Sequence, residues 1–191
     1  MDFDEGRGSR SSTTLDRDSS ERPGVGLVAR AGYSRLSELN FLTAGGELQI
    51  PVAPTVQIIA GLEFFNTQQE DTEALQALAE AANVPPAQIE DVPMEWHTMM
   101  PINIGVVYKA TKKSVRPYVG VDLTLTAYTE SFDLAFGGRV RAGADFMLAD
   151  HFGLNLNLAP GIIYGDQFED KVHIANFGLI PQISAGTVLE F

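Results

Sequence analysis

The last residues of the chain, IPQISAGTVLEF (180–191), decide the fold. Apolar and small or polar side chains alternate along them, Ile183, Ala185, Leu189 and Phe191 against Gln182, Ser184, Gly186 and Glu190. A period of two is typical of a β-strand, because successive side chains of a strand point to opposite faces. The same period runs back to Gly24, so the sequence predicts strands over most of residues 24–191.

Seven earlier stretches repeat this alternation and bring the predicted strands to eight: 25–33, 41–50, 55–65, 96–109, 115–128, 136–148 and 152–164, before the last at 175–191. Most are long enough to cross a bilayer at a tilt. No stretch approaches the ~18 apolar residues that a spanning helix needs. Helical spacing appears over 72–83 (TEALQALAEAAN), between the third and fourth strands, and Pro85 and Pro86 end it.

The face opposite the apolar one distinguishes two kinds of barrel. In a soluble barrel that face meets water and is dense in Lys and Glu. Here it carries mostly Gly, Asn, Ser, Thr and Gln, with one or two charges of either sign per strand. This composition favours a narrow polar lumen and an apolar face turned to lipid. Lipid offers no hydrogen bonds to an open sheet edge, so the strands must close. The predicted fold is all-β, an eight-stranded antiparallel up-and-down transmembrane β-barrel with one helical loop insertion.

The connections alternate in length, as they do in outer-membrane barrels. Those around 51–54, 110–114 and 149–151 are short, whereas 66–95 and 165–171 belong to the opposite end, where the longer loops gather. Outward aromatic side chains fall near both ends, in the pattern of an interfacial girdle: Tyr108, Phe152 and Phe191 near the short turns, and Tyr33, Phe64, Trp96, Tyr164 and Phe177 near the long loops.

In these features residues 24–191 resemble the small eight-stranded outer-membrane barrels of the OmpA/OmpX type. The resemblance implies a bacterial outer membrane, with its lipid and lipopolysaccharide as surroundings. It also implies that the last strand is an assembly signal, read by the barrel-assembly machinery through Ile183, Leu189 and Phe191. Residues 1–23 contain no apolar signal-peptide core, so we expect a mature form with an added start Met.

Composition narrows the function further. The net charge of −12 argues against nucleic acid as a partner, and the absence of cysteine excludes disulfides and thiolate metal sites. Residues 1–23 are polar and predict a flexible N-terminal tail. No spacing of nucleophile, base and acid or of metal ligands stands out, so we expect no catalytic residues, metal or cofactor.

The first candidate site is a charged lumen. Seven charged residues point inward by their parity: Arg30, Glu47, Glu63, Asp122, Arg139, Arg141 and Asp145. One interpretation is a structural salt-bridge network that fills a narrow barrel, since eight strands leave room for little more than side chains. The other is a path for ions or protons.

The second candidate is the acidic insertion at 66–95, which carries seven acids and no base. It is either a solvated outer loop or a docking element, in which the apolar stripe of Leu75 and Leu78 contacts the barrel or a partner helix. Three acids near its end, Glu90, Asp91 and Glu95, lack the ligand spacing of a calcium loop. Docking at this loop or the N-terminal tail is the expected function, as a structural or docking subunit of a larger envelope assembly.

Two other functions remain open. The barrel could be a narrow passive pore. It could also be a lipid-modifying enzyme at the outer rim, where His97 and His173 lie; His151 lies at the other end. Two further features have no assigned role. Lys109 and Arg116 flank Lys112 and Lys113 in a basic cluster at the short-turn end, and three prolines, Pro101, Pro160 and Pro181, interrupt strands.

Overall fold

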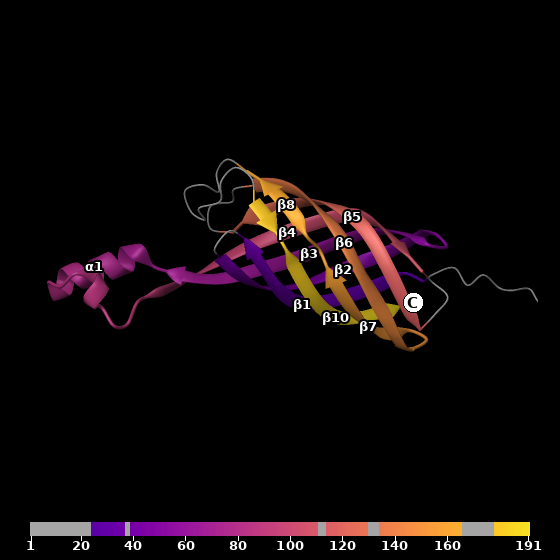
Figure 1. Ribbon diagram of the computed structural model, residues 1–191, viewed down its shortest axis with the longest axis horizontal. Coiled ribbons are helices and arrows are strands. Elements are labelled where there is room, and N and C mark those ends of the chain that lie inside the picture. The colour runs from indigo at the N-terminus through magenta and orange to yellow at the C-terminus, as the bar shows by residue number, and fades with distance from the viewer. Residues whose placement is uncertain (1–23, 37–38, 111–113, 130–133, 166–177) are drawn as a thin grey trace, which may run out of the picture.

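The computed structural model describes residues 24–36, 39–110, 114–129, 134–165 and 178–191. Its strands form one antiparallel barrel, with a helix held beyond one end (Figure 1). The elements are β1 (Gly26–Leu36), β2 (Leu39–Ala53), β3 (Val56–Glu70), α1 (Thr72–Ala82), η1 (Pro86–Gln88), β4 (Met94–Lys109), β5 (Val115–Tyr128), β6 (Leu134–Ala149), β7 (Phe152–Leu158), β8 (Gly161–Tyr164), β9 (Gly178–Ile180) and β10 (Gln182–Glu190). No helix among these residues is long and apolar enough to cross a membrane.

The barrel has eight staves, where a stave is one strand or two strands in line. The first six staves are β1 to β6, the seventh is β7 with β8, and the eighth is β9 with β10. Each stave pairs with the next, and β1 pairs with β10 from Gly26↔Glu190 to Ser34↔Gln182, so the sheet closes on itself along these residues. At the seam, the Phe191 amide donates to the Val25 carbonyl over 2.9 Å. The predicted closed eight-stranded barrel is confirmed.

Prolines divide the last two staves. Pro160 separates β7 from β8, and Pro181 separates β9 from β10, because proline has no N–H for the ladder. Pro101 lies inside β4 instead. There the pairing with β5 continues as Pro101↔Thr126, whereas the pairing with β3 passes from Ile102↔Leu62 to Met99↔Phe65.

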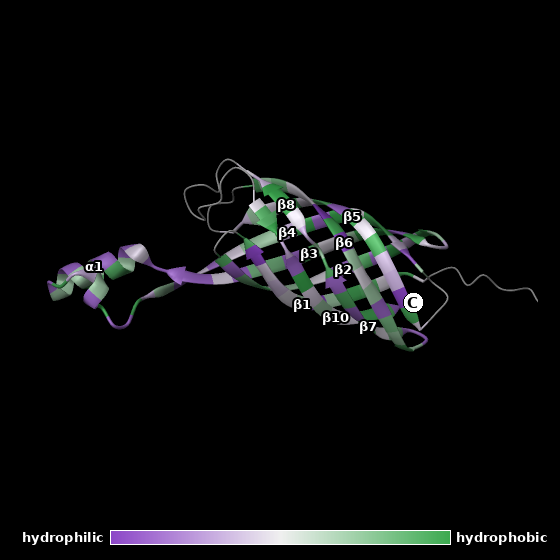
Figure 2. Ribbon diagram, viewed as in Figure 1, coloured by the Kyte–Doolittle hydropathy of each residue, from purple (hydrophilic) through white to green (hydrophobic). Residues whose placement is uncertain are grey.

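The two faces of the wall differ as the alternation predicts. Apolar and polar residues alternate in bands along the strands in Figure 2. Outward side chains are large, apolar and exposed around the whole barrel: Leu27, Leu48, Ile58, Ile104, Val119, Leu123, Val140, Leu156 and Ile183 are examples. The inward side chains of the same strands are buried and often polar or charged. Leu123, for example, is 76% exposed, whereas the neighbouring Asp122 is 3% exposed.

The third and fourth strands are longer than the sequence predicts. β3 continues through Gln69 to Glu70, and β4 begins at Met94, so parts of the predicted 66–95 loop are a β-ribbon. Predicting the strand ends at Phe65 and Trp96 was wrong because 66–70 (NTQQE) has no apolar alternation. The helix matches its prediction: it covers Thr72–Ala82, and Asn83 ends it in the left-handed conformation, with φ 53°.

Candidate functional site

Charged side chains meet at the centre of the lumen, and Glu47 of β2 is their hub. Arg30 of β1 donates to both of its oxygens, Nη1 to Oε2 over 2.8 Å and Nη2 to Oε1 over 3.1 Å. Gln49 Nε2 donates to Oε1 over 2.8 Å, and Arg141 Nη1 donates to Oε2. Four donors therefore surround this buried carboxylate, as a charge removed from water requires.

A second carboxylate extends the cluster toward β3. Asp122 Oδ2 accepts hydrogen bonds from Arg141 Nε over 3.0 Å, from Arg141 Nη2, and from Arg139 Nη2 over 3.1 Å. Arg139 Nη1 also donates to Glu63 Oε2 and to Gln182 Oε1, each over 2.7 Å. The two arginines thus link three carboxylates from three different strands.

A third group lies on the side of β4 and β7. Lys109 Nζ is 2.6 Å from both Asp145 Oδ2 and Gln49 Oε1. Asn155 Nδ2 donates to Asp145 Oδ1 over 2.6 Å, and Asn155 Oδ1 accepts from Arg30 Nε over 2.7 Å. Through Gln49 and Asn155 this third group joins the hub at Glu47.

Together these contacts make one network that touches all eight staves. Its charged members balance, with four cations and four anions: Arg30, Lys109, Arg139 and Arg141 against Glu47, Glu63, Asp122 and Asp145. We refer to these eight residues as the lumen network. They are all buried, and Arg141 is only 1% exposed. The network fills the middle of the barrel with fixed, mutually neutralised charge.

All seven charges that the sequence places in the lumen lie in this network. The eighth, Lys109, was misplaced. Its parity points inward, but the sequence groups it with Lys112 and Lys113 in a basic cluster at the short-turn end. In the structure it is fully buried against Asp145. Arg116 does not belong to a free basic cluster either, because its Nη1 lies 2.5 Å from Glu190 Oε2. Residues 111–113 lie outside the described residues.

Above the lumen network, at the end where α1 lies, the inward side chains become apolar. They form one buried cluster of Leu36, Phe41, Phe65, Met99, Tyr128, Ala135, Ile163 and Ile180. We refer to this cluster as the apolar layer. Phe41 and Phe65 form its aromatic centre, with ring centroids 6.2 Å apart. The alternation predicts an inward face but not this change of polarity along it, so the layer is a finding of the structure.

A long hairpin projects from the same end and carries α1 at its tip (Figure 1). β3 last pairs with β2 at Asn66↔Leu42, and β4 last pairs with β5 at Met99↔Tyr128. Beyond these pairs, Thr67↔His97 to Glu70↔Met94 form a ribbon that has no third strand among the described residues. We refer to residues 67–97 as the acidic arm, since they hold seven acids and neither Lys nor Arg.

The arm has a defined local structure. The Asp71 amide donates to the Pro93 carbonyl over 2.9 Å and closes the ribbon. Asp71 also caps α1, because its Oδ1 accepts from the Ala74 amide over 2.9 Å. Of the predicted apolar stripe, Leu78 is exposed, Leu75 is half-buried and Ala79 is buried. The stripe does not pack on the barrel, since α1 extends away from it in Figure 1.

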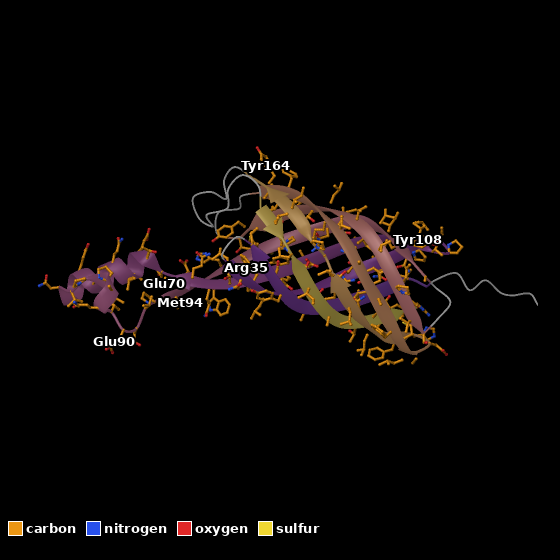
Figure 3. All side chains as sticks on the ribbon, viewed as in Figure 1. Arg35, Glu70, Glu90, Met94, Tyr108 and Tyr164 are labelled. Carbon is orange, nitrogen blue, oxygen red and sulfur yellow. The ribbon has the colours of Figure 1, made fainter. Side chains whose placement is uncertain are left out.

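The arm presents both charge and large apolar side chains to solvent. Glu90, Asp91 and Glu95 are exposed, and Met94 and Trp96 are 50% and 58% exposed. Figure 3 shows Met94 between the barrel and α1, with Glu70 beside it and Glu90 further out. Trp96 was expected in the outer aromatic girdle. It lies on the ribbon instead, opposite Gln68.

The rim histidine His97 holds the base of the arm. Its Nδ1 lies 2.5 Å from Tyr128 Oη of β5, and the two rings stack with centroids 6.1 Å apart. Glu95 Oε2 lies 3.9 Å from His97 Nε2. The two contacts with Tyr128 join the ribbon to the barrel. His173, the other histidine of the enzyme hypothesis, lies outside the described residues, as does the tail 1–23.

Of the three residues of the expected assembly signal, Ile183 and Leu189 lie on the outer face of β10, and Phe191 directly follows the strand. Ile183 and Phe191 are exposed, with Phe191 77% exposed, and Leu189 is 39% exposed. No group of three or more potential metal ligands occurs among the described residues. Glu90, Asp91 and Glu95 therefore do not come together as such a group.

Comparison with solved structures places this architecture. The chain is similar to Neisserial surface protein A, with a TM-score of 0.57 and 14% sequence identity over 88% of this chain and 97% of that one. It is also similar to the outer membrane protein OprG from Pseudomonas aeruginosa, with a TM-score of 0.54 and 12% identity over 90% and 98% of the two chains. The fold is that of the small eight-stranded outer-membrane barrels. No family model and no curated protein sequence matches the chain.

Proposed function

We propose that this chain is an integral β-barrel of a bacterial outer membrane that works as a structural and docking subunit, with the acidic arm as its binding surface. It conducts no ions and catalyses no reaction in this proposal. The apolar outer wall supports the membrane placement. Exposed apolar side chains surround the barrel, and a water-soluble protein rarely carries a contiguous apolar patch beyond a few hundred Å².

The lumen favours a structural role over a pore. The lumen network fills the centre, and the apolar layer lies between it and the end that carries the arm. An ion on this path would have to displace paired charges and then cross an apolar layer, and both steps are unfavourable. The polar lumen therefore accounts for the integrity of the barrel rather than for transport.

The acidic arm is the observation that carries the docking role. An isolated two-stranded ribbon has marginal stability in water, and seven like charges add repulsion. The arm nevertheless holds Met94 and Trp96 in solvent, and both are residue types enriched in protein interfaces. A partner with positive charge that covers Met94 and Trp96 would bury these apolar side chains and reduce the repulsion among the acids. The partner in this proposal is a protein with a basic surface.

Photo-crosslinking in native cells tests the docking role. A photoreactive amino acid replaces Trp96 or Leu78 on the arm, and the control replaces Val52, which is 56% exposed at the opposite end. We expect a discrete adduct from the arm positions and none from Val52. A second variant carries Glu73→Gln, Glu80→Gln, Glu90→Gln and Asp91→Asn and should lose the adduct.

Two results would count against docking. One is the absence of any adduct from the arm while the barrel stays folded, as heat-modifiable gel mobility would show. The other is an adduct of equal yield in the amide variant, which would mean that charge does not recruit the partner. Added salt should weaken the contact in the wild type, because exposed charges are screened within about 10 Å at 0.1 M.

A further inference from the structure

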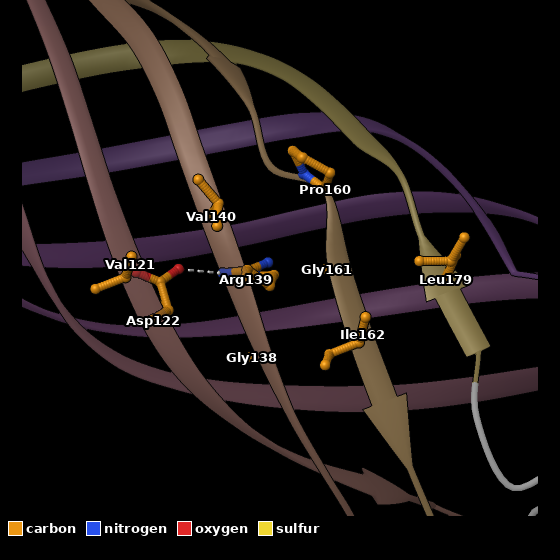
Figure 4. A pocket seen from close by; sticks show the side chains of 9 residues that line it. All are labelled: Val121, Asp122, Gly138, Arg139, Val140, Pro160, Gly161, Ile162 and Leu179. Atoms are coloured by element: carbon orange, nitrogen blue, oxygen red, sulfur yellow. Dashed lines mark hydrogen bonds and ion pairs between the residues drawn. The ribbon is translucent and has the colours of Figure 1, made fainter.

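A hollow in the outer wall lies over the staves broken by proline. Its volume is about 460 Å³, and it spans β5, β6, β8 and β9. Five apolar residues line it from the outward face: Val121, Val140, Pro160, Ile162 and Leu179 (Figure 4). All five are exposed on the outward face. Asp122 and Arg139, an ion pair of the lumen network, also contribute to its lining. We refer to this hollow as the wall groove.

Gly138 has no side chain, and the space this leaves opens the groove. It belongs to the outward set of β6, between the exposed Phe136 and Val140. A β-carbon at Gly138 would approach only the Asp122 carbonyl oxygen, at 3.4 Å, so the space above it is empty of protein. Large side chains on the neighbouring strands therefore surround a position that has none.

Pro160 lines one side of the groove, and Pro181 lies opposite it on the neighbouring stave. Between the pairs Ile180↔Gly161 and Ile183↔Leu158, Pro160 and Pro181 face each other on neighbouring staves. The Val140 amide donates to the Pro160 carbonyl over 3.0 Å, and an antiparallel pair of this kind normally exchanges two bonds. Pro160 has no N–H to return the second bond. The regular ladder is thus interrupted where the groove lies.

We propose that the wall groove holds one acyl chain of a membrane phospholipid more tightly than the rest of the wall does. The inference rests on the proposed membrane placement, which turns this face to hydrocarbon. Water is a poor occupant, because a bound water needs two to four polar partners and the lining side chains on this face are apolar. The volume lies within the range of about 300–1,000 Å³ found for ligand pockets. A flexible hydrocarbon chain matches both the lining and its surroundings.

A photoactivatable phospholipid tests this proposal. The full chain is reconstituted into phosphatidylcholine vesicles that contain a fraction of lipid with a diazirine in the middle of one acyl chain. After illumination, the labelled residues are mapped by mass spectrometry. We expect Ile162 and Leu179 to be labelled several-fold more than the outward Leu48 and Leu62, which lie outside the groove on β2 and β3.

Two glycine variants make a matched pair. Gly138→Leu fills the groove and should reduce labelling of Ile162 and Leu179 to the level of the rest of the wall. Gly46→Leu is the control, because Gly46 is also an outward glycine with open space, its nearest contact being the Val28 carbonyl at 3.8 Å. It should leave the labelling unchanged. Leu179→Ala is the alternative variant if Gly138→Leu does not fold. It removes one wall of the groove without adding bulk and should reduce labelling of Ile162.

The possible failures are distinguishable. Even labelling of all outward residues would overturn the groove proposal and leave the membrane placement intact. Absence of label at Ile162 and Leu179 while Leu48 and Leu62 are labelled would overturn it in favour of another occupant, such as a second copy of this chain. A folded barrel that takes no lipid label on any outward residue would contradict the membrane placement, and the groove proposal with it.

Discussion

Arg141 of β6 donates a hydrogen bond to Glu47 of β2 across the full width of the barrel. Three staves lie between these two strands in either direction, so the contact joins opposite walls. Arg30 and Asp122 extend it on both sides. The barrel is therefore held by backbone pairing around its circumference and by charge pairing through its centre.

Breaking this central contact should destabilise the barrel strongly. Arg141→Met leaves Glu47 and Asp122 without one of their partners, and loss of one partner from a buried ion pair costs about 3–5 kcal/mol. Urea unfolding in detergent, followed by circular dichroism, measures the change. With Glu47→Gln added, the double variant should lose less than the sum of the two single losses, since residues in one network are coupled. Strict additivity would mean that the two side chains do not interact.

The wild-type barrel should show no ion conductance in a planar bilayer. Arg141→Met should remain closed as well, because the apolar layer around Phe41 and Phe65 lies outside the lumen network. Only a variant that also removes this layer, such as Arg141→Met with Phe41→Ser and Phe65→Ser, should produce current steps. Stepwise currents from the wild type would restore the passive-pore hypothesis.

Removing the aromatic ring of Phe191 should affect assembly in cells more than stability in vitro. The side chain is 77% exposed, and its described hydrogen bond to Val25 uses the backbone amide. Phe191→Ser should therefore refold in detergent with an unfolding free energy within about 0.5 kcal/mol of the wild type. In cells we expect less folded protein in the outer membrane, measured by heat-modifiable mobility. Equal amounts of both proteins would show that Phe191 is not part of an assembly signal.

The tip of the arm should be removable without unfolding the barrel. Replacing residues 72–92 by Asn-Gly, a pair that favours a tight hairpin turn, keeps the ribbon that Asp71 and Pro93 close. Barrel stability should not change measurably in urea. The point variant Asp71→Ala should instead loosen only α1, by about 1 kcal/mol for a lost cap, seen as faster amide exchange there. A barrel that unfolds without the tip would make the arm structural.

The sequence predicts whether each described barrel residue points to the lumen or outward, but not which side chains it contacts. Alternation is local, so it assigns Arg30, Glu47 and Arg141 to the lumen directly from the chain. Which charges meet depends on the stagger of the closed barrel, a property of the whole fold. Lys109 shows the difference: its parity points inward, yet its partner Asp145 lies two strands away. The ribbon of the arm was missed because its strands are joined by backbone bonds and bury no apolar face.

The central claim is that successive positions of each strand face lipid and lumen in turn, and one measurement tests it directly. The chain contains no cysteine, so single cysteines can be placed at Leu123 and Thr124 of β5 and labelled with an environment-sensitive dye. In vesicles that contain nitroxide-labelled lipids, we predict strong quenching at position 123 and weak quenching at position 124, in a folded barrel. Equal quenching at both positions, or none at either, would contradict the account.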